Sequence, residues 1–235
     1  MQLAIASLRA QVEAKHPSAF AVYTRPERES IRTGIPQIDD SVQGVPLRAL
    51  TELCGSSLAS SGKTSLLVSL LAQASQHRFC ALVDASDAFD PQSGHAAGIN
   101  FSRMLWVRCG KNRMKLNRLE QAFKAADILL QSSGFGLIVV DLGNIPERAL
   151  RRVPLNSWFR LSRVIERQPA ALVFIEQEPH ATNCAGLVLR VQTAPATLTG
   201  KLFTSFSVNV EVVRGLENKP AQPQKQRFSL KTQWA

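Results

Sequence analysis

Short apolar segments of strand length alternate along this chain with longer segments that have helical spacing. The expected strands are residues 50–54, 79–84, 136–141 and 170–176, and the expected helices between them are 63–75, 116–131 and 154–167. Strands that are apolar on both faces are typical of a parallel sheet covered by helices. The sequence therefore predicts an α/β fold with a mostly parallel central sheet and helices on both faces.

Both ends of the chain differ from this pattern. After residue 187 apolar and polar residues alternate, as in 202–213, and a short strand is expected at 227–231, so we predict antiparallel strands at the C-terminal edge of the sheet. Residues 1–16 are expected to hold an N-terminal helix (3–16), which packs on its own domain or on a neighbouring subunit. Residues 17–32 are predicted to be a linker, and 33–235 one core domain with a basic C-terminal tail.

Composition narrows the class of protein. The chain has 28 Lys and Arg against 18 Asp and Glu, a net charge of +10, which favours an anionic partner, nucleic acid first. With 45% hydrophobic and 20% charged residues it has the composition of a globular protein. No apolar run approaches 18 residues and no secretory signal precedes the core, so we expect a cytoplasmic protein without a membrane span. The cysteines and histidines show no metal-ligand spacing; we expect buried reduced thiols, and His16, His77, His95 and His180 at the surface.

The strongest motif is Ser-Ser-Gly-Lys-Thr-Ser, which lies where an expected strand ends and an expected helix begins. The first turn of a helix offers free N–H groups and the positive end of the helix dipole to a phosphate. In such a loop Lys63 reaches the β and γ phosphates, Thr64 binds Mg²⁺ through its hydroxyl, and Gly62 allows close approach. The predicted nucleotide-binding residues are Ser60, Ser61, Gly62, Lys63, Thr64 and Ser65. The alternative is a helix cap with an exposed lysine.

The motif departs from the usual phosphate loop at its first glycine. Ser57 stands five residues before Gly62, where glycine is expected, and six residues separate the nearest glycine, Gly55, from Gly62 instead of four. A left-handed Ser57 would cost about 1–2 kcal/mol, up to about tenfold in affinity. A lengthened loop would avoid the strain and hold the phosphates less tightly. Either way we expect weak ATP binding.

A second expected site residue is Asp141, the carboxylate that ends the apolar strand 136–141. In phosphate-loop proteins such an aspartate lies beside Mg²⁺ and orients it through water. We therefore predict that Asp141 and Thr64 share the metal.

At this point the sequence resembles the RecA recombinase family over residues 31–230. The segments that carry the resemblance are Thr33-Gly34 with Ile38-Asp39, Glu52-Leu53-Cys54-Gly55, the phosphate loop, Ala81-Leu82-Val83-Asp84-Ala85, Ala88-Phe89-Asp90-Pro91, Phe174-Ile175-Glu176-Gln177, Val213-Arg214, Asn218-Lys219 and Pro220-Ala221. The resemblance implies a RecA-like fold, an adenine contact at Asp90 and a γ-phosphate sensor at Gln177. Strand alternation turns Glu176 away from Gln177.

Three departures distinguish the chain from a working recombinase. Ser86 stands where the resemblance places the catalytic glutamate, and Asp87 is expected to point the other way. Only eight residues lie between Gln177 and Gly186, a remnant of the second DNA-binding loop. We also expect no separate C-terminal domain. A hydroxyl cannot act as a general base near neutral pH, so hydrolysis is expected to be slow or absent.

A shortened RecA-like chain of this kind resembles the ImuA family, accessory factors of error-prone translesion DNA synthesis in the DNA-damage (SOS) response. The resemblance implies two protein partners, an ImuB-like polymerase homologue and an error-prone polymerase. Further candidate partners are DNA, RecA and a second copy of the chain. Two other functions stay open: a DNA-dependent ATPase recombinase of the RecA type, and a SulA-like cell-division inhibitor without enzymatic activity.

Positive charge gathers in two segments, 101–118 with six basic residues and no acid, and 147–167 with six arginines against two glutamates. The resemblance places residues 143–160 near the first DNA-facing loop. Arg148, Arg151 and Arg152 are therefore candidate phosphate contacts, and Trp158 a candidate stacking face for a base. The alternatives are a solvated helix face with Trp158 in the core, and an acidic protein partner.

Overall fold

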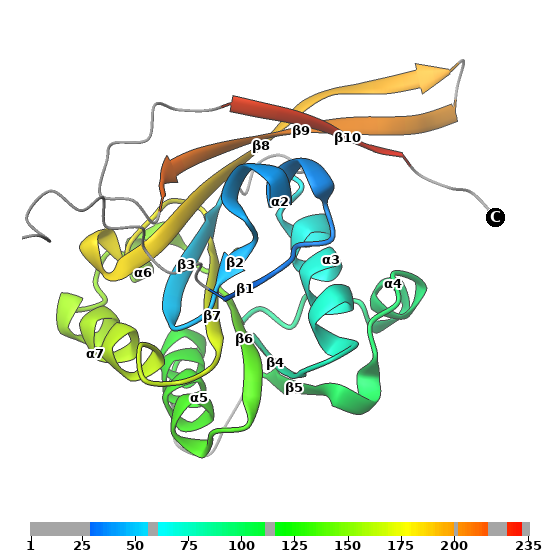
Figure 1. Cartoon of the computed structure of the whole chain (residues 1–235). Helices are drawn as coiled ribbons and strands as arrows, with labels where there is room; N and C mark the ends of the chain where they lie inside the picture. The colour runs from blue at the N-terminus through cyan, green and yellow to red at the C-terminus, as the bar shows by residue number, and fades with distance from the viewer. Residues whose placement is uncertain (1–28, 56–60, 111–115, 200–201, 216–224, 232–235) are drawn as a thin grey trace, which may run out of the picture.

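Eight strands form the central sheet in the computed structural model, which describes residues 29–55, 61–110, 116–199, 202–215 and 225–231. The strands are β3 (Ala49–Cys54), β4 (Phe79–Asp84), β5 (Met104–Arg108), β6 (Phe135–Asp141), β7 (Ala171–Glu176), β8 (Ala185–Thr199), β9 (Leu202–Arg214) and β10 (Lys225–Lys231). Their order across the sheet is β10-β9-β8-β3-β7-β6-β4-β5 (Figure 1). The phosphate-loop strand β3 therefore lies inside the sheet, between β8 and β7.

The pairing confirms a mostly parallel sheet with antiparallel strands at one edge. β3 pairs in parallel with both β7 and β8, and β4 pairs in parallel with β5 and β6. β9 then pairs antiparallel with β8 and with β10. Beyond its pairing with β3, β8 continues into a ribbon with β9 that extends past the rest of the sheet (Figure 1).

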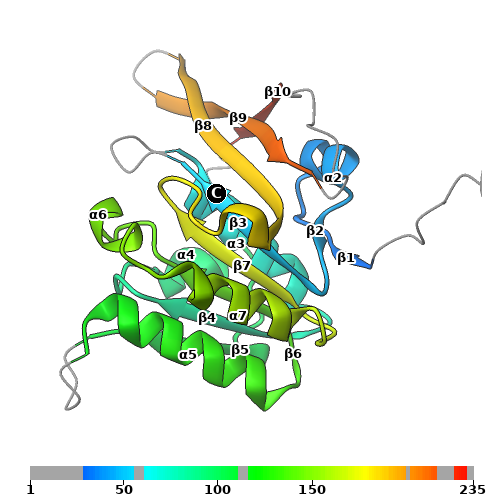
Figure 2. The same cartoon turned by 90° about the vertical axis from the view of Figure 1, so that its left-hand side faces the viewer.

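Helices cover both faces of the sheet. α2 (Pro36–Val42), α3 (Lys63–Ser75) and α4 (Pro91–Ala96) lie on one side, whereas α5 (Arg118–Ser132) and α7 (Leu155–Ile165) lie on the other, with α6 (Glu147–Leu150) between β6 and α7 (Figures 1 and 2). Two short 3₁₀ turns occur at Phe101–Arg103 and Thr182–Cys184. Within the described residues, no helix is both long and apolar enough to cross a bilayer.

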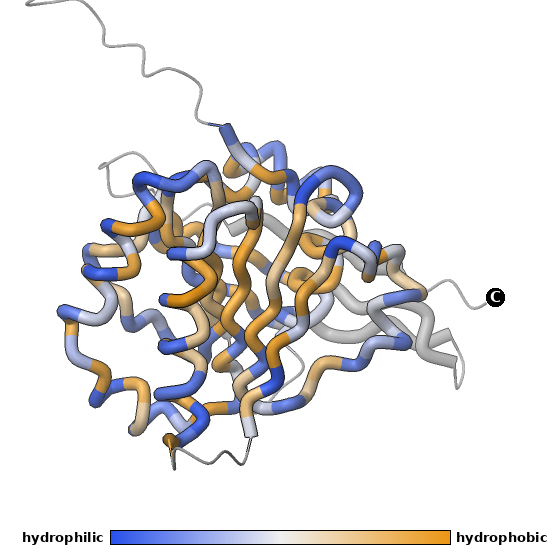
Figure 3. Tube along the Cα trace, turned by 90° about the horizontal axis from the view of Figure 1, so that it is seen from below, coloured by the Kyte–Doolittle hydropathy of each residue, from blue (hydrophilic) through white to orange (hydrophobic). Residues whose placement is uncertain are grey.

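Alternate residues of the central strands feed two separate cores. On β7, Val173 and Ile175 pack toward α3, whereas Leu172 and Phe174 pack toward α5 and α7. Apolar residues accordingly run along the strands in the middle of the molecule, and polar residues gather on the outer helix surfaces (Figure 3). This two-sided burial explains why these strands are apolar throughout their length.

Trp158 belongs to the second core. Its side chain is 1% exposed, and its ring lies edge-on to Phe174 at 4.9 Å and to Phe123 at 5.0 Å between centroids. The prediction that Trp158 offers a stacking face to a base is therefore wrong, and the core alternative is correct. Helical spacing explains the placement, because Trp158, Leu161 and Ile165 recur at i, i+3 and i+7 on the buried face of α7.

The N-terminal helix predicted over 3–16 lies outside the described residues, as does most of the predicted linker 17–32. The last part of that linker forms a strand, β1 (Ser30–Ile31), which pairs antiparallel with β2 (Val45–Pro46). The four cysteines, Cys54, Cys80, Cys109 and Cys184, are buried free thiols. Burial raises the pKa of Cys80 to about 12, so this thiol stays protonated at neutral pH.

Candidate nucleotide site

The head of α3 begins at the carboxyl end of β3, as the motif predicts. Gly62 immediately precedes the helix with a φ of 84°, and a Cβ at this position would lie 2.8 Å from Val208 Cγ2. Only glycine combines the left-handed backbone with this close approach. Gly62 also has no side chain with which to cap the helix, so the N–H groups of the first turn can serve an anion. Ser57 and Ser60 lie outside the described residues.

Lys63 is buried, with 8% of its surface exposed. Its ammonium group donates to the carbonyl oxygen of Gly55 at 2.6 Å and to that of Glu176 at 3.1 Å. Burial lowers the pKa of Lys63, and the nearby Asp141 charge opposes this shift. The alternative of a helix cap with an exposed lysine is therefore wrong. An ammonium group has three donors, so one remains for a ligand.

Asp141 and Lys63 lie close to the same small residue, Gly143. Asp141 Oδ1 accepts the N–H of Gly143 at 2.9 Å, and a Cβ on Gly143 would lie 3.1 Å from that oxygen and 3.6 Å from Lys63 Nζ. Burial raises the pKa of Asp141, since a carboxylate is poorly solvated there. Thr64 is exposed on the first turn of α3. A carboxylate and a hydroxyl are oxygen ligands of the kind that Mg²⁺ prefers.

Three aspartates lie at the end of β4 and in the loop after it, and each is bound to groups outside the candidate nucleotide site. Asp84 is buried and accepts the N–H groups of Ala88 at 3.1 Å and Phe89 at 2.9 Å. Asp87 forms a two-point contact with Arg108, which lowers the pKa of that carboxyl. Backbone N–H groups thus hold the carboxylate of Asp84, and Arg108 holds that of Asp87.

Ser86 and Asp90, two predicted site residues, lie in the same loop. Ser86 is half-buried, and its carbonyl oxygen accepts a hydrogen bond from Arg118 at 3.2 Å. Asp90 caps α4, where its oxygens accept the N–H groups of Gln92 at 3.1 Å and Ser93 at 3.0 Å. A hydrogen bond from the Ser93 hydroxyl, together with these two bonds, lowers the pKa of Asp90. Capping gives Asp90 a structural role of its own, and its adenine contact stays a prediction.

Gln177 bonds the segment that follows Asp141. Its Nε2 donates to the carbonyl oxygens of Gly143 at 3.2 Å and Ile145 at 3.0 Å. The side chain predicted to sense a γ-phosphate thus holds the backbone beside the two charged groups of the site.

A family model described as the RecA N-terminal domain matches residues 21–150, more than half of the chain. This chain belongs to the RecA family. Among curated relatives, Protein RecA of Rickettsia africae (strain ESF-5) and that of Rickettsia conorii (strain ATCC VR-613 / Malish 7) are each 27% identical over 241 residues, covering 92% of this chain and 66% of the relative. Protein RecA of Desulfovibrio desulfuricans (strain ATCC 27774 / DSM 6949 / MB) is 26% identical over 197 residues, covering 76% and 51%. The chain spans just under two thirds of the Rickettsia proteins.

This RecA-family chain also buries two carboxylates that sequence reasoning did not assign. Glu52 Oε1 accepts the N–H groups of His180 and Ala181, both at 2.6 Å, and His180 Nδ1 lies 2.6 Å from Glu176 Oε2. The other oxygen of each glutamate has no partner among the described residues. Burial raises the pKa of Glu176 to about 7. His180 was expected at the surface, and this is wrong, because its side chain is 9% exposed.

The basic residues of segments 101–118 and 147–167 do not form one surface, because they contact several different groups. Arg151 pairs with Glu147 one helical turn away, whereas Arg148 and Arg152 are exposed. Arg108 binds Asp87 and lies 4.9 Å from the Trp106 ring. In the same basic segment, 101–118, Arg103 and Arg118 donate to the carbonyl oxygens of Gln76 and Ser86, and Lys111, Arg113 and Lys115 lie outside the described residues. Arg148 and Arg152 therefore stay candidates for a phosphate backbone.

Proposed function

We propose that this RecA-family chain is a cytoplasmic accessory protein of error-prone DNA repair synthesis. In this role it binds ATP and Mg²⁺ weakly, hydrolyses ATP slowly or not at all, and supports protein and DNA partners. The observation that carries the proposal is the buried Lys63 ammonium beside Asp141 at the head of α3, next to a loop whose acids are engaged elsewhere.

The described residues fit a nucleotide with Mg²⁺. Lys63 keeps one donor for phosphate, and Thr64 and Asp141 supply oxygens for the metal. A bound Mg²⁺ would neutralise phosphate charge. Phosphate would in turn relieve the burial penalty on the Lys63 cation, because it supplies the opposite charge at close range.

Binding without efficient turnover follows from the loop after β4. Asp84, Asp87 and Asp90 each hold other partners, and Ser86 supplies only a hydroxyl. Loss of a general base typically reduces turnover by 10²–10⁴-fold. This loss favours a scaffold over a DNA-dependent ATPase recombinase.

The segment between β7 and β8 supports the accessory role. It is short, and it is held to β3 by Glu52 and to β7 by Glu176 through His180 and Ala181. A segment held in this way favours a fixed structure over a long DNA-binding loop. Together with the resemblance to the ImuA family, this favours an ImuB-like polymerase homologue and an error-prone polymerase as partners, with DNA contacted through exposed arginines.

The test is titration of ATP with Mg²⁺, with turnover measured in the presence and absence of single-stranded DNA. We expect measurable binding and little turnover. Lys63→Ala should weaken binding by at least about tenfold, since charged hydrogen bonds contribute roughly 1.5–3 kcal/mol. Arg103→Ala, which removes a cation at the opposite edge of the sheet, is the matched control. Unchanged affinity in Lys63→Ala would contradict the nucleotide site, and DNA-stimulated turnover at recombinase rates would contradict the accessory role.

A further inference from the structure

The outer face of α7 exposes two large apolar side chains among arginines. Leu155 is 51% exposed and Phe159 is 42% exposed. Arg160, Arg163 and Arg167 are exposed along the same side of the helix and the turn after it. The inner face of α7 is packed in the core, whereas the part of the chain that the structure describes leaves these outer side chains exposed.

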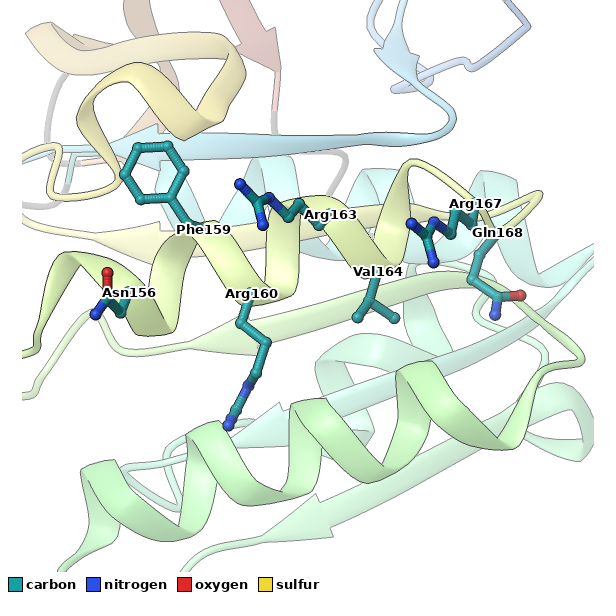
Figure 4. Close-up of a pocket in the computed structure, with 7 residues that line it drawn as sticks. All are labelled: Asn156, Phe159, Arg160, Arg163, Val164, Arg167 and Gln168. Carbon is teal, nitrogen blue, oxygen red and sulfur yellow. The ribbon is translucent and has the colours of Figure 1, made fainter.

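Phe159 and the three arginines line an open hollow of about 620 Å³ (Figure 4). Its lining residues are Asn156, Phe159, Arg160, Arg163, Val164, Arg167 and Gln168, with no acid among them. Arg160 points toward α5, where it lies 3.5 Å from Asp127. The exposed acid at this end of the helix, Glu166, lines a different hollow. The surface therefore combines an aromatic anchor with two arginines for which no acidic partner is found among the described residues, Arg163 and Arg167.

This surface is separate from the nucleotide site. α7 lies on the face of the sheet opposite α3, and it runs toward the amino end of β7, away from the edge that holds Lys63 and Asp141 (Figure 2). No step of the proposed nucleotide chemistry uses it.

The spacing of the arginines and the exposed apolar side chains indicate which kind of molecule fits the outer face of α7. Arg160 and Arg163 lie one turn apart on α7, which is about 16 Å long, and Arg167 follows in the turn after the helix. A phosphate backbone would satisfy the arginines but not the exposed Leu155. A helix with acids beside an apolar stripe satisfies both, because acids and apolar residues recur on it with the same period.

We propose that the outer face of α7 is the docking surface for an acidic amphipathic helix of a partner protein. The inference rests on the scaffold part of the proposed function and names the chemistry of the partner. Phe159 and Leu155 would contact the apolar stripe, and Arg163 and Arg167 would pair with its acids.

The test uses the full-length protein and three fluorescent probes. They are a 21-residue peptide with leucine at heptad positions a and d and glutamate elsewhere, the same peptide with lysine in place of glutamate, and a 20-nucleotide oligo-dT. We expect micromolar binding of the glutamate peptide and no binding of the lysine peptide. The glutamate peptide should compete poorly with oligo-dT.

Matched variants locate the surface. Phe159→Ala should weaken peptide binding at least about fivefold, whereas Phe79→Ala, at a phenylalanine that is 57% exposed on β4, should not. The pair Arg163→Glu and Arg167→Glu should weaken binding at least about tenfold. The pair Arg78→Glu and Arg103→Glu, just before β4 and β5, makes the same change in net charge and should have little effect.

Three results would overturn the docking proposal: no binding of the glutamate peptide, equal losses from both charge-reversed pairs, or oligo-dT binding that only the Arg163 and Arg167 changes remove. The last result would assign the surface to nucleic acid. ATP titration of the same samples separates the two proposals. Retained ATP binding without peptide binding overturns the docking surface alone, and peptide binding without ATP binding overturns the nucleotide site alone.

Discussion

The ammonium group of Lys63 lies 3.1 Å from the main-chain oxygen of Glu176, while the side chain of Glu176 lies on the opposite side of the sheet, 2.6 Å from His180 Nδ1. One residue at the end of β7 thus contacts the candidate phosphate site through its backbone and the segment before β8 through its carboxylate. A displacement of the segment that contains His180 could therefore be transmitted to Lys63 through Glu176 alone.

The buried carboxyl of Glu176 predicts a pH-dependent stability. Burial raises its pKa from 4.5 to about 7, so between these values the folded protein holds a proton that the unfolded chain releases. The free energy of unfolding should therefore fall as the pH rises through this window, by roughly 1.4 kcal/mol per pH unit. Glu52 and His180, which face Glu176, also have raised pKa values and act in the same direction.

Urea unfolding from pH 4.5 to 7.5 measures this dependence for the natural protein and for Glu176→Gln. The difference in unfolding free energy between them should decrease as the pH rises, because glutamine does not titrate. Parallel curves for the two proteins would show that Glu176 holds no extra proton in the folded state.

Ser86→Glu should increase ATP turnover. A carboxylate at this position would supply the general base that the loop after β4 lacks, and such a group typically contributes 10²–10⁴-fold. We expect at least about a tenfold gain in phosphate release at saturating ATP. Ser86→Gln is the control of equal size without the charge. Retained ATP binding with no gain in Ser86→Glu would mean that residue 86 does not face the reacting phosphate.

Adjacent aromatic residues on α7 should differ sharply in their effect on stability. Trp158→Ala removes a fully buried ring and should lower the free energy of unfolding by about 3–5 kcal/mol. Phe159→Ala removes a ring that is 42% exposed and should lower it by less than about 1 kcal/mol. Chemical unfolding measures both, and similar losses would contradict the orientation of α7.

DNA binding through Arg148 and Arg152 predicts a steep dependence of affinity on salt. If Arg148 and Arg152 contact phosphates, the affinity for single-stranded DNA should fall steeply with salt, and the slope of log affinity against log salt should shrink by roughly one for each arginine replaced by alanine. Arg78→Ala, at the amino edge of the sheet, should leave the slope unchanged. A flat salt response in the natural protein would assign these arginines to a protein partner.

Much of the fold follows from local pattern. The bounds of α3 and β4 agree with those predicted, since Gly62 marks the start of α3 and an apolar run marks β4. β5 was not predicted, because this edge strand is partly exposed and lies within a basic cluster that conceals its alternation.

Long-range contacts explain what the sequence could not show at the candidate site. The contact of Glu52 with the backbone of His180 and Ala181 joins residues more than a hundred positions apart. The only local signal was a glutamate within each of two otherwise apolar strands, Glu52 on β3 and Glu176 on β7. The motif, by contrast, predicted that Lys63 and Asp141 belong to one site, because parallel strands bring their carboxyl ends to one edge.

β8 and β9 contact the two glycines that bracket the candidate phosphate loop. A Cβ at Gly55 would lie 2.6 Å from the carbonyl oxygen of Val191 on β8, and Gly62 packs against Val208 on β9. Close-packed groups of this kind shift together rather than independently. A force applied to the projecting ribbon would therefore be transmitted to Gly55 and Gly62, the residues that bracket the candidate phosphate loop.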